Sequence, residues 1–432
     1  MIESDPANTI QKVLLQLRRG IDPHPPLYFF LVHFWFQLVG YSAFTARLIS
    51  AIAGIIAIPA MYVLGKELYN RRVGLIAAAF TTFNFYNIFY SQEARGYIFA
   101  FLFTCISFIF FIRALRDPSW KRGLWYGIVT SFLVYTHYYG FFIVLSQVVI
   151  LLILLTRDTL KHLLICFGIA FSLLFILYFP WLGSLLALTK RESIWIAKPK
   201  ANFFVTYFWD YFGQDAFTVY AVAFLLILFL LAGTLQKRDE ADPSDIRENR
   251  YLFSFVILLT WIIVSYMVPF VKSLVSLPVL FNRYTIVTLP AILLAAAIGL
   301  DLIFHSFLKK YIVILIACFS LIHLFAFDRY YEKPTRTQWR EMIGFVVQNN
   351  PQNFPIISDR TWHLAYYFKL LNANPQYVSE KAIPKLTDVW VITGNQGKPL
   401  SKQAEQLLNT DFKLKLEFKG ISTWAYYYSR MK

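Results

Sequence analysis

The chain has 432 residues, of which 58% are hydrophobic and 15% are charged. Soluble globular proteins contain about 45–50% apolar and about 25% charged residues, so this composition excludes a soluble enzyme, a disordered protein and a disulfide scaffold. The formal charge of +16 is explained by basic loops that orient membrane helices and face anionic lipid. We therefore expect membrane lipids, and no nucleic acid, among its partners.

The charged residues divide the chain into two parts. Residues 331–432 hold 22 of the 66 charged side chains, which is close to the composition of a soluble protein. The patterns of residues 338–348, 354–357, 389–392, 414–418 and 424–428 predict one helix followed by four strands in this part. We predict a polytopic membrane domain over residues 1–330 and a soluble α/β domain over residues 331–432, with the boundary near Tyr330.

Ten apolar stretches precede this boundary, each close to the length needed to cross a bilayer. They predict about ten transmembrane helices over residues 44–65, 73–90, 96–112, 123–137, 139–155, 163–183, 217–235, 251–270, 284–304 and 311–327. Residues 27–39 form an apolar stretch too short to cross, and residues 203–212 resemble an interfacial aromatic belt. The three cysteines fall in apolar runs and are expected to be buried thiols.

The distribution of lysine and arginine predicts the orientation. If the first span runs inward, the inner loops carry 15 of these residues in 45 positions, and the outer segments carry 10 in 85. Inner loops of membrane proteins are enriched in Lys and Arg. This predicts a multi-pass protein of the inner (plasma) membrane, with the N-terminus and the soluble domain both extracytoplasmic.

Polar residues of the types that bind ligands or act in catalysis collect on the predicted outer face. Ionisable groups at membrane depth are costly, so those that persist usually line a cavity. The candidates are Asp22, His24, Glu93, Arg95, Tyr97, His137, Tyr138, Lys190, Arg191 and Arg283. Several cations near a carboxylate suit a phosphate-containing substrate, because guanidinium groups bind phosphate oxygens bidentately. A polyprenyl phosphate is both anionic and a lipid.

Simpler explanations remain open for each candidate. Glu93 and Arg95 fit a solvated pair, and His137 fits a packing residue among aromatics. The segment 22–26 fits a rigid proline turn. Lys190 and Arg191 fit lipid-headgroup anchors, and Arg283 fits an anchor at the start of a span. Their convergence on one face favours a site more than any one of them does.

Several motifs in order resemble bacterial GT-C-fold glycosyltransferases, the relatives of protein O-mannosyltransferases and of lipid A aminoarabinose transferase. These are DPHPPLYFFLVHFW (22–35), ARLISA (46–51), RRVGLIAA (71–78), YSQEARGY (90–97), YTHYYG (135–140), FPWL (179–182) and NRYTIVTLP (282–290), followed by TQWREMIGFV (337–346). The resemblance implies transfer of a sugar from a polyprenyl-phosphate donor to a lipid, glycan or protein acceptor outside the membrane.

The resemblance also implies roles for individual residues. Glu93 matches an acidic residue that helps to bind donor phosphate or a metal, so a divalent cation is a candidate cofactor. Arg95 and Arg283 match phosphate-facing cations, with Lys190 and Arg191 as further phosphate-binding candidates. His24 belongs to a motif beside the reaction centre, and Tyr97, His137 and Tyr138 would line the cavity.

One departure from the family pattern concerns the catalytic base. Family members carry an Asp-Glu pair in a first outer loop, after another span, and neither that pair nor that span is present before His24. Asp22, His24 and Glu93 are therefore the candidate catalytic residues, and the base itself is unknown. Two alternatives stay open: a transporter or flippase of lipid-linked glycans, and a truncated, non-catalytic homologue.

Overall fold

A computed structural model describes residues 8–18, 24–156, 159–191, 196–235, 249–395 and 397–431. They form two compact units, which divide between Leu324 and Phe325. The sequence placed the domain boundary near Tyr330, in the same short segment. Each unit has its own hydrophobic core.

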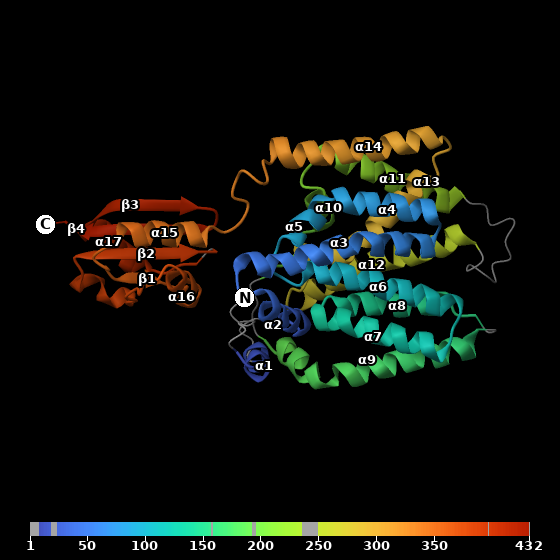
Figure 1. Ribbon diagram of the computed structural model, residues 1–432, viewed down its shortest axis with the longest axis horizontal. Helices are drawn as coiled ribbons and strands as arrows, with labels where there is room; N and C mark the ends of the chain where they lie inside the picture. Colours follow the sequence, from blue (N-terminus) through green and yellow to red (C-terminus); the bar gives the residue numbers. More distant parts are fainter. Residues whose placement is uncertain are drawn as a thin grey trace. The chain divides into compact units, whose positions relative to one another are not determined.

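The first unit is entirely helical where it is described, and its long helices run side by side (Figure 1). Its elements are α1 (Ile10–Arg18), α2 (Leu27–Val39), α3 (Ala43–Leu68), α4 (Arg71–Phe83), α5 (Phe85–Ser91), α6 (Tyr97–Arg116), α7 (Trp120–Thr136), α8 (Gly140–Ile153), α9 (Leu160–Thr189), α10 (Phe203–Tyr211), α11 (Ala216–Leu235), α12 (Arg250–Val275), η2 (Asn282–Val287), α13 (Leu289–Asp301), α14 (Ser306–Ile322) and η3 (His323–Phe327). α3 packs against α4 and α6, α7 against α9, and α11 against α13.

Each of the ten predicted spans contains helix, but not all of these helices have the length of a span. Among the residues that the structure describes, six helices can cross a membrane by length and composition: α3, α6, α9, the part of α11 up to Gly233, α12, and α14 continued by η3. The pair α4 and α5 qualifies as a seventh, with a bend of 60°. α7, α8 and α13 are shorter, at 17, 14 and 13 residues. The chain is a multi-pass α-helical membrane protein.

Asn84 causes the bend between α4 and α5. Its backbone is extended, and its side chain accepts a hydrogen bond from the Asn87 N–H at 2.9 Å, which begins a new helix. Its amide nitrogen donates to the carbonyl of Tyr211 at 3.0 Å. This side chain therefore both caps α5 and ties it to α10, which holds the loop after α5 in place.

The helices approach closely at glycines. A Cβ on Gly65 of α3 would lie 2.8 Å from the Gly74 Cα of α4, closer than packed atoms allow. Cys105 and Cys166 are buried as expected, but the prediction for Cys318 was wrong, because this residue is exposed. It lies on α14, whose surface is mostly uncovered by protein, so an apolar run here indicates a face suited to lipid and not a protein core.

The second unit is a four-stranded sheet with helices. Its elements are α15 (Trp339–Asn349), β1 (Ile356–Ser358), α16 (Thr361–Leu370), η4 (Glu380–Lys385), β2 (Asp388–Gly394), α17 (Lys402–Asp411), β3 (Phe412–Gly420) and β4 (Thr423–Arg430). The strand order is β1-β2-β4-β3, with β1 and β2 parallel and the other pairs antiparallel. The predicted helix and all four predicted strands are present, and the sequence missed α16 and α17.

Candidate functional site

Three aromatic side chains from three separate segments meet around His137. The His137 ring lies 5.6 Å from that of His24, 5.8 Å from that of Tyr97 and 4.7 Å from that of Tyr284, measured between centroids. His24 precedes α2, Tyr97 begins α6, His137 follows α7 and Tyr284 lies in η2. We call these four residues the histidine–tyrosine cluster.

The backbone explains the position of His137. α7 ends at Thr136, and the extended His137 closes it by donating its N–H to the Leu133 carbonyl at 3.1 Å. The ring Nδ1 accepts a hydrogen bond from the Tyr139 N–H at 3.1 Å. An accepting Nδ1 carries no proton, so the neutral ring bears its proton on Nε2. The ring is buried, at 5% exposure, and its orientation is therefore fixed.

Arg283 lies against the same cluster, with aromatic rings around its guanidinium. Its Cζ is 5.6 Å from the ring centre of Tyr97, 6.0 Å from that of Tyr284 and 5.0 Å from that of Phe281. Burial opposes its charge, but Tyr97, Tyr284 and Glu93 outweigh that effect and raise the pKa of Arg283 above its usual value. Arg283 is thus a permanent cation held at the faces of aromatic rings.

The loop after α5 brings Glu93 and Arg95 to this place. The Arg95 N–H donates to the Glu93 carbonyl at 2.8 Å, which forms a tight turn just before α6 begins. Glu93 interacts electrostatically with Arg283, and both Glu93 and Arg95 interact with Tyr97. Glu93 is partly buried and Arg95 is exposed. The loop therefore supplies one anion and one cation at the edge of the cluster.

Three of the remaining predicted residues lie near the end of α9. The Tyr138 hydroxyl accepts a hydrogen bond from Trp181 Nε1 of α9 at 3.1 Å. Burial raises the pKa of Tyr138, while Trp181 and the nearby Arg191 lower it. Tyr138 and Arg191 thus lie near the C-terminal end of α9. The exposed Lys190 directly follows this helix. Asp22 lies outside the residues that the structure describes.

The structure adds a polar pair that the sequence analysis missed. Asn282, next to Arg283 in the chain, donates a hydrogen bond from Nδ2 to the Asp210 carboxylate and accepts one from the Tyr86 hydroxyl. Burial raises the pKa of Asp210 above its ordinary value, against a hydrogen bond from Gln214. The sequence did contain a clue to this pair, because Asp210 is the one acidic residue in the aromatic stretch 203–212.

The residues around Glu93 do not fit a metal site. Over the described ranges, no three His, Cys, Asp or Glu side chains come together as metal ligands. Within the described residues, Glu93 acts on the guanidinium of Arg283 and the phenol of Tyr97. We therefore assign no chemical step to a metal ion.

Comparisons with known proteins agree with this architecture. Residues 23–183 match the family model for dolichyl-phosphate-mannose-protein mannosyltransferase. ArnT from Cupriavidus metallidurans in the apo state is similar at 9% identity, with a TM-score of 0.60 over 95% of this chain and 91% of ArnT. The chain has the GT-C fold. Among curated proteins, none matches significantly.

Two further solved GT-C proteins are similar. ArnT bound to undecaprenyl phosphate has 11% identity and a TM-score of 0.55, over 93% of this chain and 87% of ArnT. AglB from Archaeoglobus fulgidus, in complex with an inhibitory peptide and a dolichol-phosphate, has 12% identity and a TM-score of 0.55, over 94% of this chain and 66% of AglB. The family match covers part of the chain, and the likenesses to solved structures show its fold.

Proposed function

We propose that this chain transfers a sugar from a polyprenyl-phosphate donor to an acceptor on the outer face of the membrane. The observation that carries the proposal is the partly buried Arg283, held among Tyr97, Phe281 and Tyr284 beside Glu93. A partly buried guanidinium that keeps its charge is suited to an anionic oxygen. The matched family is named for a dolichyl-phosphate donor, and ArnT and AglB bind undecaprenyl phosphate and dolichol-phosphate.

The proposed reaction is an inverting displacement at the anomeric carbon. An acceptor oxygen or nitrogen forms the new bond to this carbon, and the bond from the carbon to the phosphate oxygen breaks. The acceptor proton passes to a base, and the electron pair leaves with the polyprenyl phosphate. Arg283, with Arg95 at the edge of the cluster, stabilises the charge that develops on the leaving phosphate.

Asp210 is our candidate for the base within the described residues. Its pKa is raised by burial, and a base works best when its pKa approaches the operating pH. Its hydrogen bond from Asn282 joins it to the turn that carries Arg283. His24 and Glu93 remain candidates from the sequence, but Glu93 already faces Arg283, which favours a role in positioning this cation.

The experiment that tests the function uses membranes containing this chain, labelled lipid-linked sugars and an envelope extract as the acceptor source. We expect a labelled product that is lost in Arg283→Gln and reduced about 10²–10⁴-fold in Asp210→Asn, the usual contribution of a general base. Arg329→Gln is the matched control, since its side chain is 58% exposed in the second unit. Equal transfer by Arg283→Gln and the control would contradict the proposal.

A further inference from the structure

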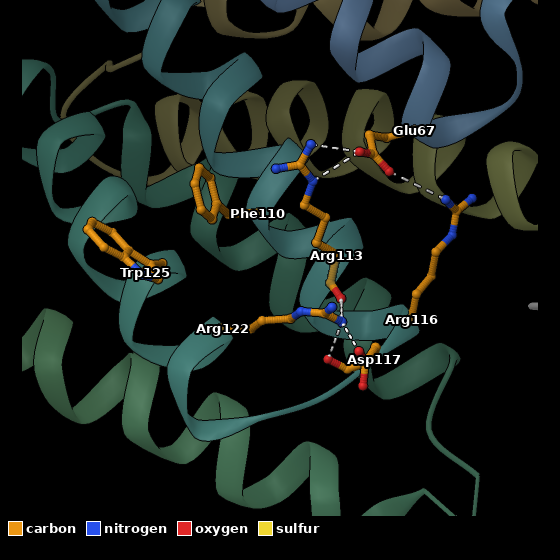
Figure 2. A pocket seen from close by; sticks show the side chains of 7 residues that line it. All are labelled: Glu67, Phe110, Arg113, Arg116, Asp117, Arg122 and Trp125. Atoms are coloured by element: carbon orange, nitrogen blue, oxygen red, sulfur yellow. Dashed lines mark hydrogen bonds and ion pairs between the residues drawn. The ribbon is translucent and has the colours of Figure 1, made fainter.

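A second group of arginines lies at the opposite end of α6 from Tyr97. Arg113 and Arg116 occupy the last turn of α6, and Arg122 reaches the same place from the first turn of α7. Figure 2 shows the three guanidiniums around the carboxylates of Glu67 and Asp117. Together with Phe110 and Trp125 they line a pocket of about 610 Å³, which we call the basic pocket.

Two of these arginines form a fixed frame. Arg113 donates to Glu67 Oε1 from Nε at 3.0 Å and from Nη2 at 2.7 Å. Arg122 lies 2.7 Å from the Asp117 carboxylate and donates to the carbonyls of Arg113 and Asp117 at the end of α6. The roles of Arg113 and Arg122 are thus explained by the fold itself.

Arg116 is different. Its Nη1 lies 3.7 Å from Glu67 Oε2, beyond hydrogen-bond length, and Glu67 is already engaged by Arg113. Its side chain is 41% exposed, and it packs over the ring of Phe253 in α12 at 5.3 Å. Arg250, at the start of α12, adds a second positive charge that acts on it. The pocket therefore holds more cationic than anionic charge, with the excess at Arg116.

The surroundings of the basic pocket are typical of the depth at which lipid headgroups lie in a membrane. α6 is long and apolar enough to span a membrane and ends at Arg116. Trp125 in the pocket wall and Trp120 at the start of α7 are 55% and 56% exposed, as expected of the aromatic belts that mark this depth.

We propose that the basic pocket binds the phosphodiester headgroup of an anionic phospholipid, with Arg116 as the principal contact. The ion-paired Arg113 and Arg122 hold the wall of the pocket around Arg116, and Phe110 and Trp125 pack against the apolar part of the lipid. Basic pockets between transmembrane helices bind anionic headgroups in this way. The site is separate from the histidine–tyrosine cluster and does not depend on the proposed sugar transfer.

The test measures binding of phosphatidylglycerol to the full chain in nanodiscs of phosphatidylcholine, by competition with a fluorescent phosphatidylglycerol. We expect a preference for phosphatidylglycerol that falls about fivefold in Arg116→Gln, the amount typical of one basic residue near an anionic surface. Glu67→Gln should raise the preference, because it removes an opposing charge. Arg72→Gln is the matched control, since Arg72 is an exposed cation that begins α4 outside the pocket.

Three results would overturn the proposal. One is equal binding of phosphatidylglycerol and phosphatidylcholine by the unmodified chain. The second is an equal loss in Arg116→Gln and Arg72→Gln, which would show a general surface-charge effect. The third is displacement of the fluorescent lipid by inorganic phosphate as effectively as by phosphatidylglycerol, which would show a site for a soluble anion.

Discussion

At the scale of single residues, the main feature of this protein is a charge kept in a largely aromatic environment. Arg283 is enclosed by Tyr97, Phe281 and Tyr284. These rings attract the cation through their faces and do not neutralise it as a carboxylate would. The rings therefore hold the guanidinium in position beside Glu93, which also acts on it.

A substitution at Glu93 distinguishes two roles for its carboxylate beside Arg283. The carboxylate either positions this cation or repels the anionic donor. If it positions the guanidinium, Glu93→Ala should raise the KM for a lipid-linked sugar donor about tenfold and leave kcat nearly unchanged, because the base is elsewhere. Steady-state kinetics with a labelled donor make the measurement. A lower KM, as simple removal of a negative charge predicts, would contradict the positioning role.

The pKa of Asp388 predicts that the stability of the second unit depends on pH. Burial alone would raise its pKa, but hydrogen bonds, among them one from the Tyr427 hydroxyl at 2.7 Å, outweigh this and hold the pKa of Asp388 below its usual value. A lowered pKa stabilises the fold above the ordinary Asp value of about 3.9, and the contribution is lost as pH falls through the folded-state value.

Hydrogen exchange of the β2 and β4 amides in the full chain measures this contribution. We expect Asp388→Asn to reduce protection relative to the unmodified chain at pH 7, and to reduce it by less at pH 3. Tyr427→Phe should show the same trend, because it removes the same hydrogen bond. A difference that is the same at both pH values would contradict the account.

At the scale of elements, glycines set how closely the helices pack. A Cβ on Gly299 of α13 would lie 2.0 Å from the carbonyl oxygen of Leu225 in α11, whereas one on Gly168 of α9 meets nothing within 4 Å. Because the Gly299 contact is with backbone, Gly299→Ala must move one helix, at a cost of about 1–3 kcal/mol.

Thermal unfolding in detergent distinguishes these two substitutions. We expect Gly299→Ala to lower the melting temperature. Gly168→Ala should raise it slightly, because alanine is about 0.5–1 kcal/mol better than glycine inside a helix. Equal melting temperatures for the two variants would show that α11 and α13 do not pack as closely as described here.

Hydropathy predicts the elements of this chain well for a physical reason. A membrane-spanning helix needs a long apolar run, so the stretches of residues 44–65 and 251–270 mark α3 and α12 directly. Hydropathy could not predict the bend at Asn84, because it depends on a hydrogen bond to Tyr211 in a distant segment. The exposure of Cys318 was also missed, since buried and lipid-facing runs have the same composition.

At the scale of the whole molecule, the two ends of the first unit differ in chemistry. Tyr97 at the start of α6 belongs to the histidine–tyrosine cluster, and Arg116 at its end belongs to the basic pocket. Topology alone assigns each loop to one side of the membrane. The sequence therefore predicted a common outer side for His24, Glu93, Tyr97, His137 and Arg283. It could not separate Tyr138 from them, since the direction of a side chain depends on its contact with Trp181.

The central claim is that the site around Arg283 recognises the phosphate of a polyprenyl phosphate. The most direct measurement compares thermal stabilisation of the purified chain by undecaprenyl phosphate and by undecaprenol, which lacks the phosphate. The account predicts stabilisation by undecaprenyl phosphate well above that by undecaprenol, and loss of this difference in Arg283→Gln. Equal stabilisation by the two lipids, or an unchanged difference in Arg283→Gln, would contradict it.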